Sequence, residues 1–175
     1  MGISQTPQAL VPASLSSGAG NMAQIATGTL SGASVVISGL TSYTDILILM
    51  SGVTNNTANG QYYLRLNETS TNHDTMGFRS DSWSTTDSTN DSDFYLVGTT
   101  VSRTSSANKF GIKLTNCKNL GFTDIDIQSR FLNTASTDVA AWYKGIYTKS
   151  EAVSSITLRA SGGTWASGTY TVWGA

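Results

Sequence analysis

The sequence is poor in charge. Of its 175 residues, 12% are Asp, Glu, Lys or Arg, and the formal net charge is −1. An average globular chain carries about twice that fraction of charged residues. A nearly neutral chain has little electrostatic attraction for phosphate backbones or anionic lipids. We therefore expect neither a nucleic acid nor a membrane among its partners.

Cysteine is almost absent, and long apolar runs are missing. Cys117 is the only cysteine, so the chain cannot form an internal disulfide, and a structural zinc site lacks its usual thiolates. We expect Cys117 to be a small buried side chain beside a strand. No stretch reaches the roughly 18 consecutive apolar residues of a membrane-spanning helix. Residues 1–8 lack the basic and long apolar regions of a secretory signal.

The side chains that carry most catalysis are also scarce. His73 is the only histidine, and its polar surroundings in the sequence favour a turn. A Ser-His-Asp triad would have to be built around it, and no Gly-x-Ser-x-Gly motif accompanies it. Glu68 and Glu151 are the only glutamates, whereas Asp124 and Asp126 have the spacing of one strand face and are expected to meet solvent or counterions. We predict no catalytic residue, no metal ligand and no cofactor, so the chain is not expected to be an enzyme.

Both prolines, Pro7 and Pro12, lie near the start of the chain. They bias this segment toward an extended conformation, and the small residues 14–20 form a link after it. We therefore divide the chain into an extended N-terminal arm, residues 1–20, and a domain of residues 21–175. An apolar arm of this kind is expected to lie against a neighbouring chain or against its own domain. The arm residues expected to make the contact are Ile3, Pro7, Leu10, Val11 and Pro12.

What the sequence does contain is a series of short runs in which apolar and polar residues alternate. Tyr62, Leu64 and Leu66 share one face of such a run, and threonines recur on the opposite faces of others. Alternation with a period of two is typical of a half-buried strand, and β-branched threonine suits its solvent face. Strands are predicted at residues 22–30, 33–38, 44–51, 60–67, 94–101, 109–115, 120–131, 139–148, 153–159 and 168–174. About ten short strands separated by polar turns predict an all-β chain, a jelly-roll-like antiparallel β-sandwich.

Two segments depart from this alternation. Ile46–Met50 is continuously apolar, which is typical of a strand that is covered on both faces or lies at a subunit interface. Residues 68–93 are dense in Ser, Thr, Asn and Asp and are predicted to be a long surface loop. Trp83 in this loop would suit stacking against a sugar, although anchoring of the loop to the domain is the simpler interpretation.

The same loop contains oxygen ligands that suit calcium. They are Asp87, Asn90, Asp91 and Asp93. Their spacing matches no calcium loop, and aspartates commonly cap turns in hydroxyl-rich segments. We therefore prefer the turn interpretation to a metal site.

Three stretches together resemble a module of tailed-bacteriophage structural proteins. They are Tyr43–Gly52, Tyr63–Asn67 and the C-terminal Ser155–Gly174, which ends in Tyr-Thr-Val-Trp-Gly. The resemblance spans roughly residues 22 to 175, but only these stretches carry it. It implies a jelly-roll-like sandwich in the virion, commonly a homotrimer, and it brings no catalytic residue.

The position in the virion is argued from the chain itself. A tail fibre usually has repeats or a heptad stalk, and neither occurs here. A compact domain with a short apolar arm better suits a capsid decoration or cement protein that binds the major capsid protein on the assembled capsid surface and stabilises it. The alternative is a tail-fibre or tail-tip receptor-binding or adaptor protein that recognises host surface glycans. A free carbohydrate-binding module outside any virion is a third hypothesis.

Overall fold

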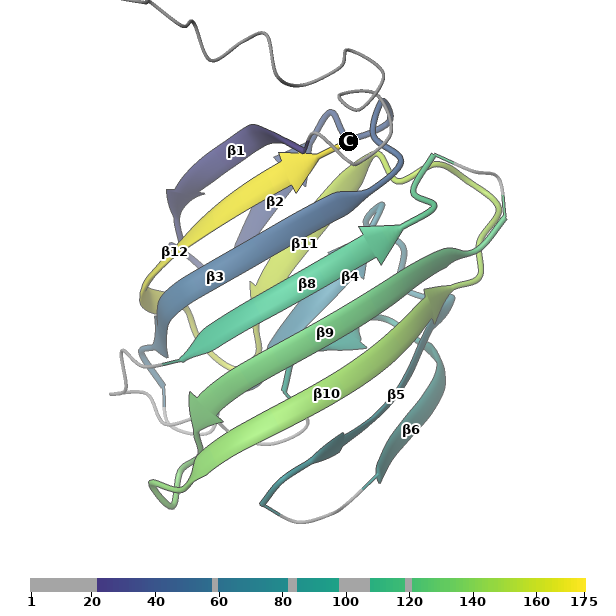
Figure 1. The fold of residues 1–175 in the computed structure, drawn as a ribbon. Helices are drawn as coiled ribbons and strands as arrows, with labels where there is room; N and C mark the ends of the chain where they lie inside the picture. The colour runs from purple at the N-terminus through teal and green to yellow at the C-terminus, as the bar shows by residue number, and fades with distance from the viewer. Residues whose placement is uncertain (1–21, 58–59, 82–84, 98–107, 119–120) are drawn as a thin grey trace, which may run out of the picture.

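The structure is a computed structural model, and it describes residues 22–57, 60–81, 85–97, 108–118 and 121–175. These residues form strands and no helix, and the strands make two antiparallel sheets packed as a sandwich (Figure 1). The predicted all-β sandwich is confirmed, whereas the jelly-roll topology stays a prediction. Within the described ranges no helix has the length and hydropathy needed to cross a membrane.

The larger sheet has eight strands. Their order across the sheet is β1 (Ala23–Thr29), β12 (Trp165–Gly174), β3 (Ile46–Asn55), β8 (Lys109–Thr115), β9 (Thr123–Leu132), β10 (Asp138–Tyr147), β5 (His73–Arg79) and β6 (Thr85–Asp91). The smaller sheet has four strands in the order β2 (Ser34–Ser38), β11 (Ser155–Ala160), β4 (Tyr62–Leu66) and β7 (Phe94–Tyr95). Sequence neighbours therefore often lie in different sheets.

The core fills the space between the sheets. Tyr62, Leu64 and Leu66 of β4 are fully buried, as the alternation predicted. Their partners across the sandwich include Phe110 of β8, whose ring meets the ring of Tyr62 edge-on at a centroid distance of 5.6 Å. In each long strand, every second side chain points into the core. The side chains between them point outward and form the outer face of their sheet.

Strand β3 is buried on one face only. Ile46, Ile48 and Met50 lie in the core, but Leu49 points outward and is 45% exposed. The continuously apolar segment is thus not covered on both faces by its own chain. Its other predicted role, at a subunit interface, stays a prediction.

The predicted loop at residues 68–93 is wrong. Within it β5 and β6 form an antiparallel pair that extends the larger sheet beyond β10. Of the strand predicted at 94–101, Phe94 and Tyr95 pair as β7, residues 96–97 are not in a strand, and residues 98–101 lie outside the described residues. The other nine predicted strands are confirmed with shifts of a few residues at their ends.

The last two strands of the chain do not pair with each other. β11 pairs with β2 and β4, whereas β12 pairs with β1 and β3, so the chain crosses from one sheet to the other between them. Gly168 bulges in β12 with φ of 129°, a backbone conformation that glycine adopts without strain.

Two small side chains are fully buried between strand ends. Cys117 lies just after β8, as predicted, and burial raises the pKa of its thiol to about 12. Asn108 precedes β8, donates from Nδ2 to the Val53 carbonyl at 2.8 Å, and accepts the Leu132 amide at Oδ1 at 3.0 Å. Asn108 thereby joins the ends of β3 and β9.

Candidate functional site

The outer face of the four-stranded sheet is polar and highly organised. Pairing places Arg159 of β11 opposite Tyr63 of β4, and Tyr63 opposite Tyr95 of β7. Arg65 lies two residues further along β4, on the same face as Tyr63. These outward side chains follow from the alternation that buries Tyr62, Leu64 and Leu66 on the opposite face.

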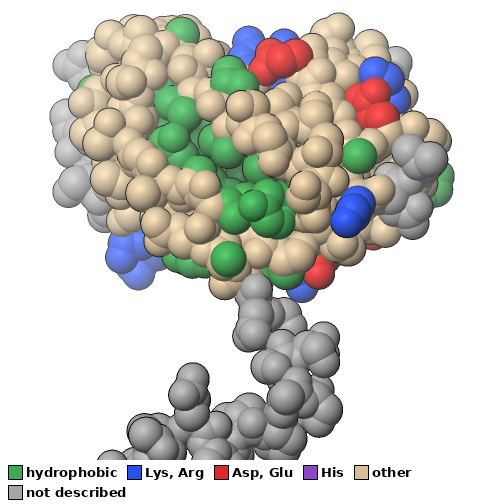
Figure 2. All heavy atoms as spheres, turned by 90° about the horizontal axis from the view of Figure 1, so that it is seen from above, with side chains coloured by type: hydrophobic (Ala, Val, Ile, Leu, Met, Phe, Trp, Pro, Cys, Tyr) green, Lys and Arg blue, Asp and Glu red, His purple; other side chains and the backbone are tan. Residues whose placement is uncertain are grey.

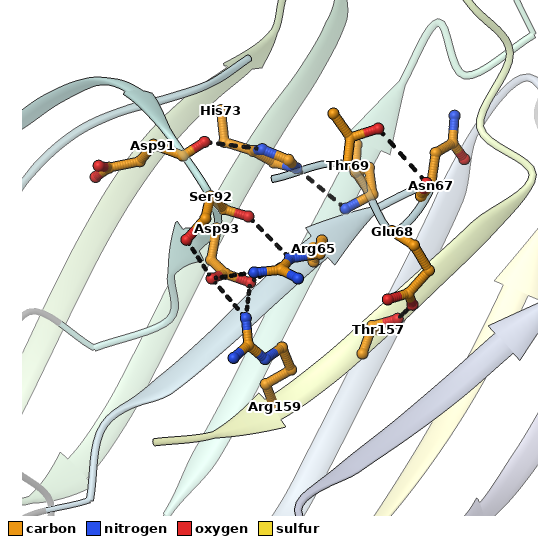
Figure 3. A network of polar contacts seen from close by, with 11 residues as sticks. Arg65, Asn67, Glu68, Thr69, His73, Asp91, Ser92, Asp93, Thr157 and Arg159 are labelled. Atoms are coloured by element: carbon orange, nitrogen blue, oxygen red, sulfur yellow. Dashed lines mark hydrogen bonds and ion pairs between the residues drawn. The ribbon is translucent and has the colours of Figure 1, made fainter. Parts of the chain in front are cut away.

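Asp93 holds two arginines together on this face, as Figure 3 shows. Arg65 binds its carboxylate through Nε to Oδ1 and through Nη2 to Oδ2, both at 3.0 Å. Arg159 Nη1 lies 2.9 Å from Oδ1 and 2.8 Å from Oδ2. The Ser92 hydroxyl donates to Oδ2 at 2.8 Å. Because the Asp93 side chain is only 9% exposed, these charge-assisted bonds are shielded from water on one side.

A polar hollow of about 370 Å³ opens beside this ion-pair cluster. Its principal lining residues are Tyr63, Asp91, Asp93, Tyr95, Arg159 and Ser161. The rings of Tyr63 and Tyr95 lie 5.3 Å apart between centroids and are tilted by 56°. Burial raises the pKa of both phenols, so they remain neutral hydroxyls at ordinary pH. We call this feature the tyrosine hollow.

His73 supports the cluster from inside the sandwich. It is fully buried on β5 and not in a turn, which corrects the sequence interpretation. Its Nε2 accepts the Leu66 amide at 3.2 Å, and Nδ1 lies 3.1 Å from the Asp91 carbonyl, to which it donates (Figure 3). Burial lowers the pKa of His73, so the imidazole is neutral. In that state it links β4, β5 and the end of β6.

The outer face of the eight-stranded sheet is more apolar. Most of the large hydrophobic side chains that the described residues expose lie on it: Leu49, Met76, Phe78, Trp142 and Ile146. Pairing sets Trp142 of β10 opposite Phe78 of β5, and their rings stack with centroids 5.2 Å apart. A hollow of about 480 Å³ lies between Leu49 and Trp142. Gly111 is among its lining residues, because it has no side chain to fill the space. We call this surface the large-sheet face.

Charges on the large-sheet face are balanced. The basic side chains are Lys109, Lys113, Arg130 and Lys144, and the acidic ones are Asp74, Asp124, Asp126 and Asp138. Arg130 and Asp138 form an ion pair at 2.6 Å, and Lys144 pairs with Asp126. The prediction that Asp124 and Asp126 face solvent or counterions is confirmed.

A third surface lies at the open edge of the sandwich. β1 and β2 are edge strands of their sheets and both lie at the top of Figure 1. From above, hydrophobic side chains gather in the middle of this face (Figure 2). Ile25 of β1 and Val35 of β2 are partly buried against the core.

The residues predicted to make contacts lie outside the described residues. These are Ile3, Pro7, Leu10, Val11 and Pro12 of the arm, and Trp83. Among the proposed calcium ligands, the side chains of Asp87 and Asn90 are outside the description, and Asp93 binds two arginines. The described residues contain no group of three or more His, Cys, Asp or Glu side chains that could hold a metal ion.

Sequence reasoning missed the tyrosine hollow. The sequence did indicate the part of the hollow that β4 forms, because the alternation that buries Tyr62 also turns Tyr63 and Arg65 outward. The arrival of Asp93, Tyr95 and Arg159 beside them depends on the sheet order, which no local pattern gives. The chain matches no protein-family model and no curated protein sequence.

Proposed function

We propose that the chain is a non-enzymatic structural protein of a bacteriophage virion, a capsid decoration or cement protein that binds the assembled capsid and stabilises it. In this proposal the protein is a homotrimer on the capsid surface, and the major capsid protein is its other partner. The resemblance of Tyr43–Gly52, Tyr63–Asn67 and Ser155–Gly174 to phage virion modules supports the setting.

The strand order supports the jelly-roll part of this proposal. Strands β1, β12, β3 and β8 lie in one sheet, and β2, β11, β4 and β7 lie in the other. Consecutive strands lie in different sheets at every connection except β5–β6, β8–β9 and β9–β10, as is typical of a jelly roll. The pairs β5–β6 and β9–β10 are additions that widen the larger sheet.

The observation that carries an assembly role is the large-sheet face. Five large hydrophobic side chains are exposed on it, and stacked aromatics such as Phe78 and Trp142 are typical anchors of interfaces. Eight strands of seven or ten residues, at about 4.8 Å spacing, offer roughly 1,100 Å². A stable interface needs about 800 Å² from each partner.

We assign this face to a neighbouring copy of the same chain. Its described charged side chains, four basic and four acidic, balance one another, and the chain as a whole has a net charge of only −1, so a neighbouring copy can meet this face without strong repulsion. In a trimer the large-sheet face of one copy lies against a different surface of the next copy, and three such heterologous contacts close a ring. The arm, which precedes the edge strand β1 in the sequence, remains for contact with the capsid.

Capsids that lack the protein allow a direct test of the arm. The full chain, added to such capsids and sedimented with them, is expected to bind and to raise the temperature at which they release DNA. A chain without residues 1–20 is expected to remain in the supernatant. Undiminished binding of the shortened chain would contradict the role of the arm.

The oligomeric state tests the large-sheet face. Sedimentation is expected to show a trimer for the full chain and a shift toward monomer for Trp142→Ala. Phe122→Ala is the matched control, because Phe122 is exposed on a turn outside the strands of this face. A chain that stays monomeric at all concentrations, or a Trp142→Ala trimer of unchanged stability, would contradict the assignment.

A further inference from the structure

The tyrosine hollow lies on the opposite side of the sandwich from the large-sheet face, so the proposed self-assembly leaves it open. From its geometry we propose that it is a binding site for a neutral carbohydrate. The inference goes beyond the decoration role, which is proposed for the large-sheet face and the arm.

The shape of the hollow fits a sugar ring. Its volume of about 370 Å³ falls within the range of about 300–1,000 Å³ that ligand pockets occupy. Tyr63 and Tyr95 both line the hollow, with their rings tilted by 56° to each other, and we assign the C–H face of a pyranose to this pair. Tyrosine combines such an apolar ring with a hydroxyl that remains wet, which suits a ligand with one apolar face and a rim of hydroxyls.

Sugar hydroxyls both donate and accept hydrogen bonds, and the polar groups around the two rings include donors and acceptors. Arg159 and the Tyr95 hydroxyl donate, whereas the carboxylate of Asp91 accepts. Both hydrogen bonds from Arg159 to Asp93 use Nη1, and among the described residues Arg159 makes no other hydrogen bond, so Nε and Nη2 remain to meet a ligand. Ser161 adds one more hydroxyl.

The charge of the lining argues for a neutral ligand. Two aspartates stand beside one lining arginine, with Arg65 paired behind Asp93, so positive and negative charges cancel. An anion would meet the carboxylates of Asp91 and Asp93, and a cation would meet Arg159. A neutral ligand with many hydroxyls meets neither obstacle.

The site is also fixed before a ligand arrives. Asp93 accepts five hydrogen bonds, from Arg65, Arg159 and Ser92, which hold Arg159 at the wall of the hollow. The Tyr63 hydroxyl donates to Gln61 Oε1. Groups that are already oriented lose less conformational entropy on binding.

An array of neutral glycans with different sugars and linkages, probed with the full chain, tests the proposal. The strongest binder is then titrated into 15N-labelled full chain, followed by NMR. We expect shifts centred on Tyr63, Tyr95 and Arg159. We expect Tyr95→Ala to weaken binding by roughly tenfold or more, as the loss of one stacking ring does.

Two control variants show whether a loss of affinity comes from the lost ring or from a general disturbance of the fold. Tyr95→Phe keeps the ring and is expected to retain binding within about threefold. Val36→Thr lies on β2 of the same outer face, away from the hollow, and is expected to bind as the parent does. Hexagalacturonate, an anionic sugar, is the charged comparison.

Three results would overturn the proposal. They are the absence of binding to every neutral glycan on the array, unchanged affinity of the Tyr95→Ala variant, and binding of hexagalacturonate alone. Binding of the chain to capsids is a separate measurement, so a failure here and a failure of the decoration role are distinguishable.

Discussion

The guanidinium of Arg159 sits directly over the carboxylate of Asp93, with Nη1 2.9 Å from Oδ1 and 2.8 Å from Oδ2. Arg65 binds the same carboxylate from the neighbouring strand. A single aspartate therefore binds two arginines that the sheet register brings to one face. The arrangement ties β4 and β11 to the segment that leads into β7, and it forms one wall of the tyrosine hollow.

Removal of the Asp93 charge is expected to destabilise the fold. In Asp93→Asn two arginines remain close together with no counterion, in a place where Asp93 is only 9% exposed. We expect the free energy of unfolding to fall by about 1–3 kcal/mol, less than for a fully buried pair because both arginines are partly solvated. Urea unfolding measures this change.

The control for that experiment is Asp138→Asn. Asp138 forms a geometrically similar pair with Arg130, but both side chains are largely exposed. Its loss is expected to leave the unfolding midpoint nearly unchanged. If both substitutions lower the free energy of unfolding equally, the Asp93 cluster stabilises the fold no more than an exposed ion pair does.

His73 is expected to make stability depend on pH. Burial lowers its pKa in the folded state below the ordinary value of 6.5. Above pH 6.5 both the folded and unfolded states have a neutral imidazole; below it the unfolded chain binds the proton first. Stability is therefore complete above that value and falls as the pH drops toward the folded-state pKa, by up to about 1.4 kcal/mol per pH unit.

Urea unfolding between about pH 8 and about pH 5 checks this dependence. His73→Gln can retain a hydrogen bond but cannot bind a proton in this range, so its stability is expected to change less with pH. Identical slopes for the parent and His73→Gln would show that His73 does not cause the dependence.

Replacement of the buried Asn108 is expected to lower the free energy of unfolding. Asn108→Ala leaves the Val53 carbonyl and the Leu132 amide without their partner, since Asn108 is fully buried between them. The expected loss is about 1–3 kcal/mol of unfolding free energy. Gln24→Ala on the exposed side of β1 is the control, and a loss no larger than that of the control would contradict this role.

Much of the fold was predictable because most of its strands alternate apolar and polar residues with a period of two. Alternation identified β4 and β9 with the correct inward faces, since burial of one face repeats every second residue. The same signal failed at β6, whose sequence Thr85–Asp91 contains no apolar residue. That strand forms because β5 offers it a hydrogen-bonded edge, and tertiary pairing of this kind overrides local propensity.

The functional surfaces were less predictable because they depend on sheet order. His73 lies in a polar run of sequence, yet it is buried by packing against Phe94 and Tyr147. The meeting of Tyr63 and Tyr95 brings β4 beside β7, across the inserted β5–β6 pair. No composition or spacing encodes that juxtaposition.

The central claim is that the protein decorates a capsid, and its copy number in purified virions tests this most directly. A quantitative gel compares the band of this chain with the bands of the major capsid protein and a tail protein. The decoration role predicts a copy number of the same order as that of the major capsid protein. A copy number matching the tail protein would favour the tail receptor-binding alternative, and absence from the virion would contradict the proposal altogether.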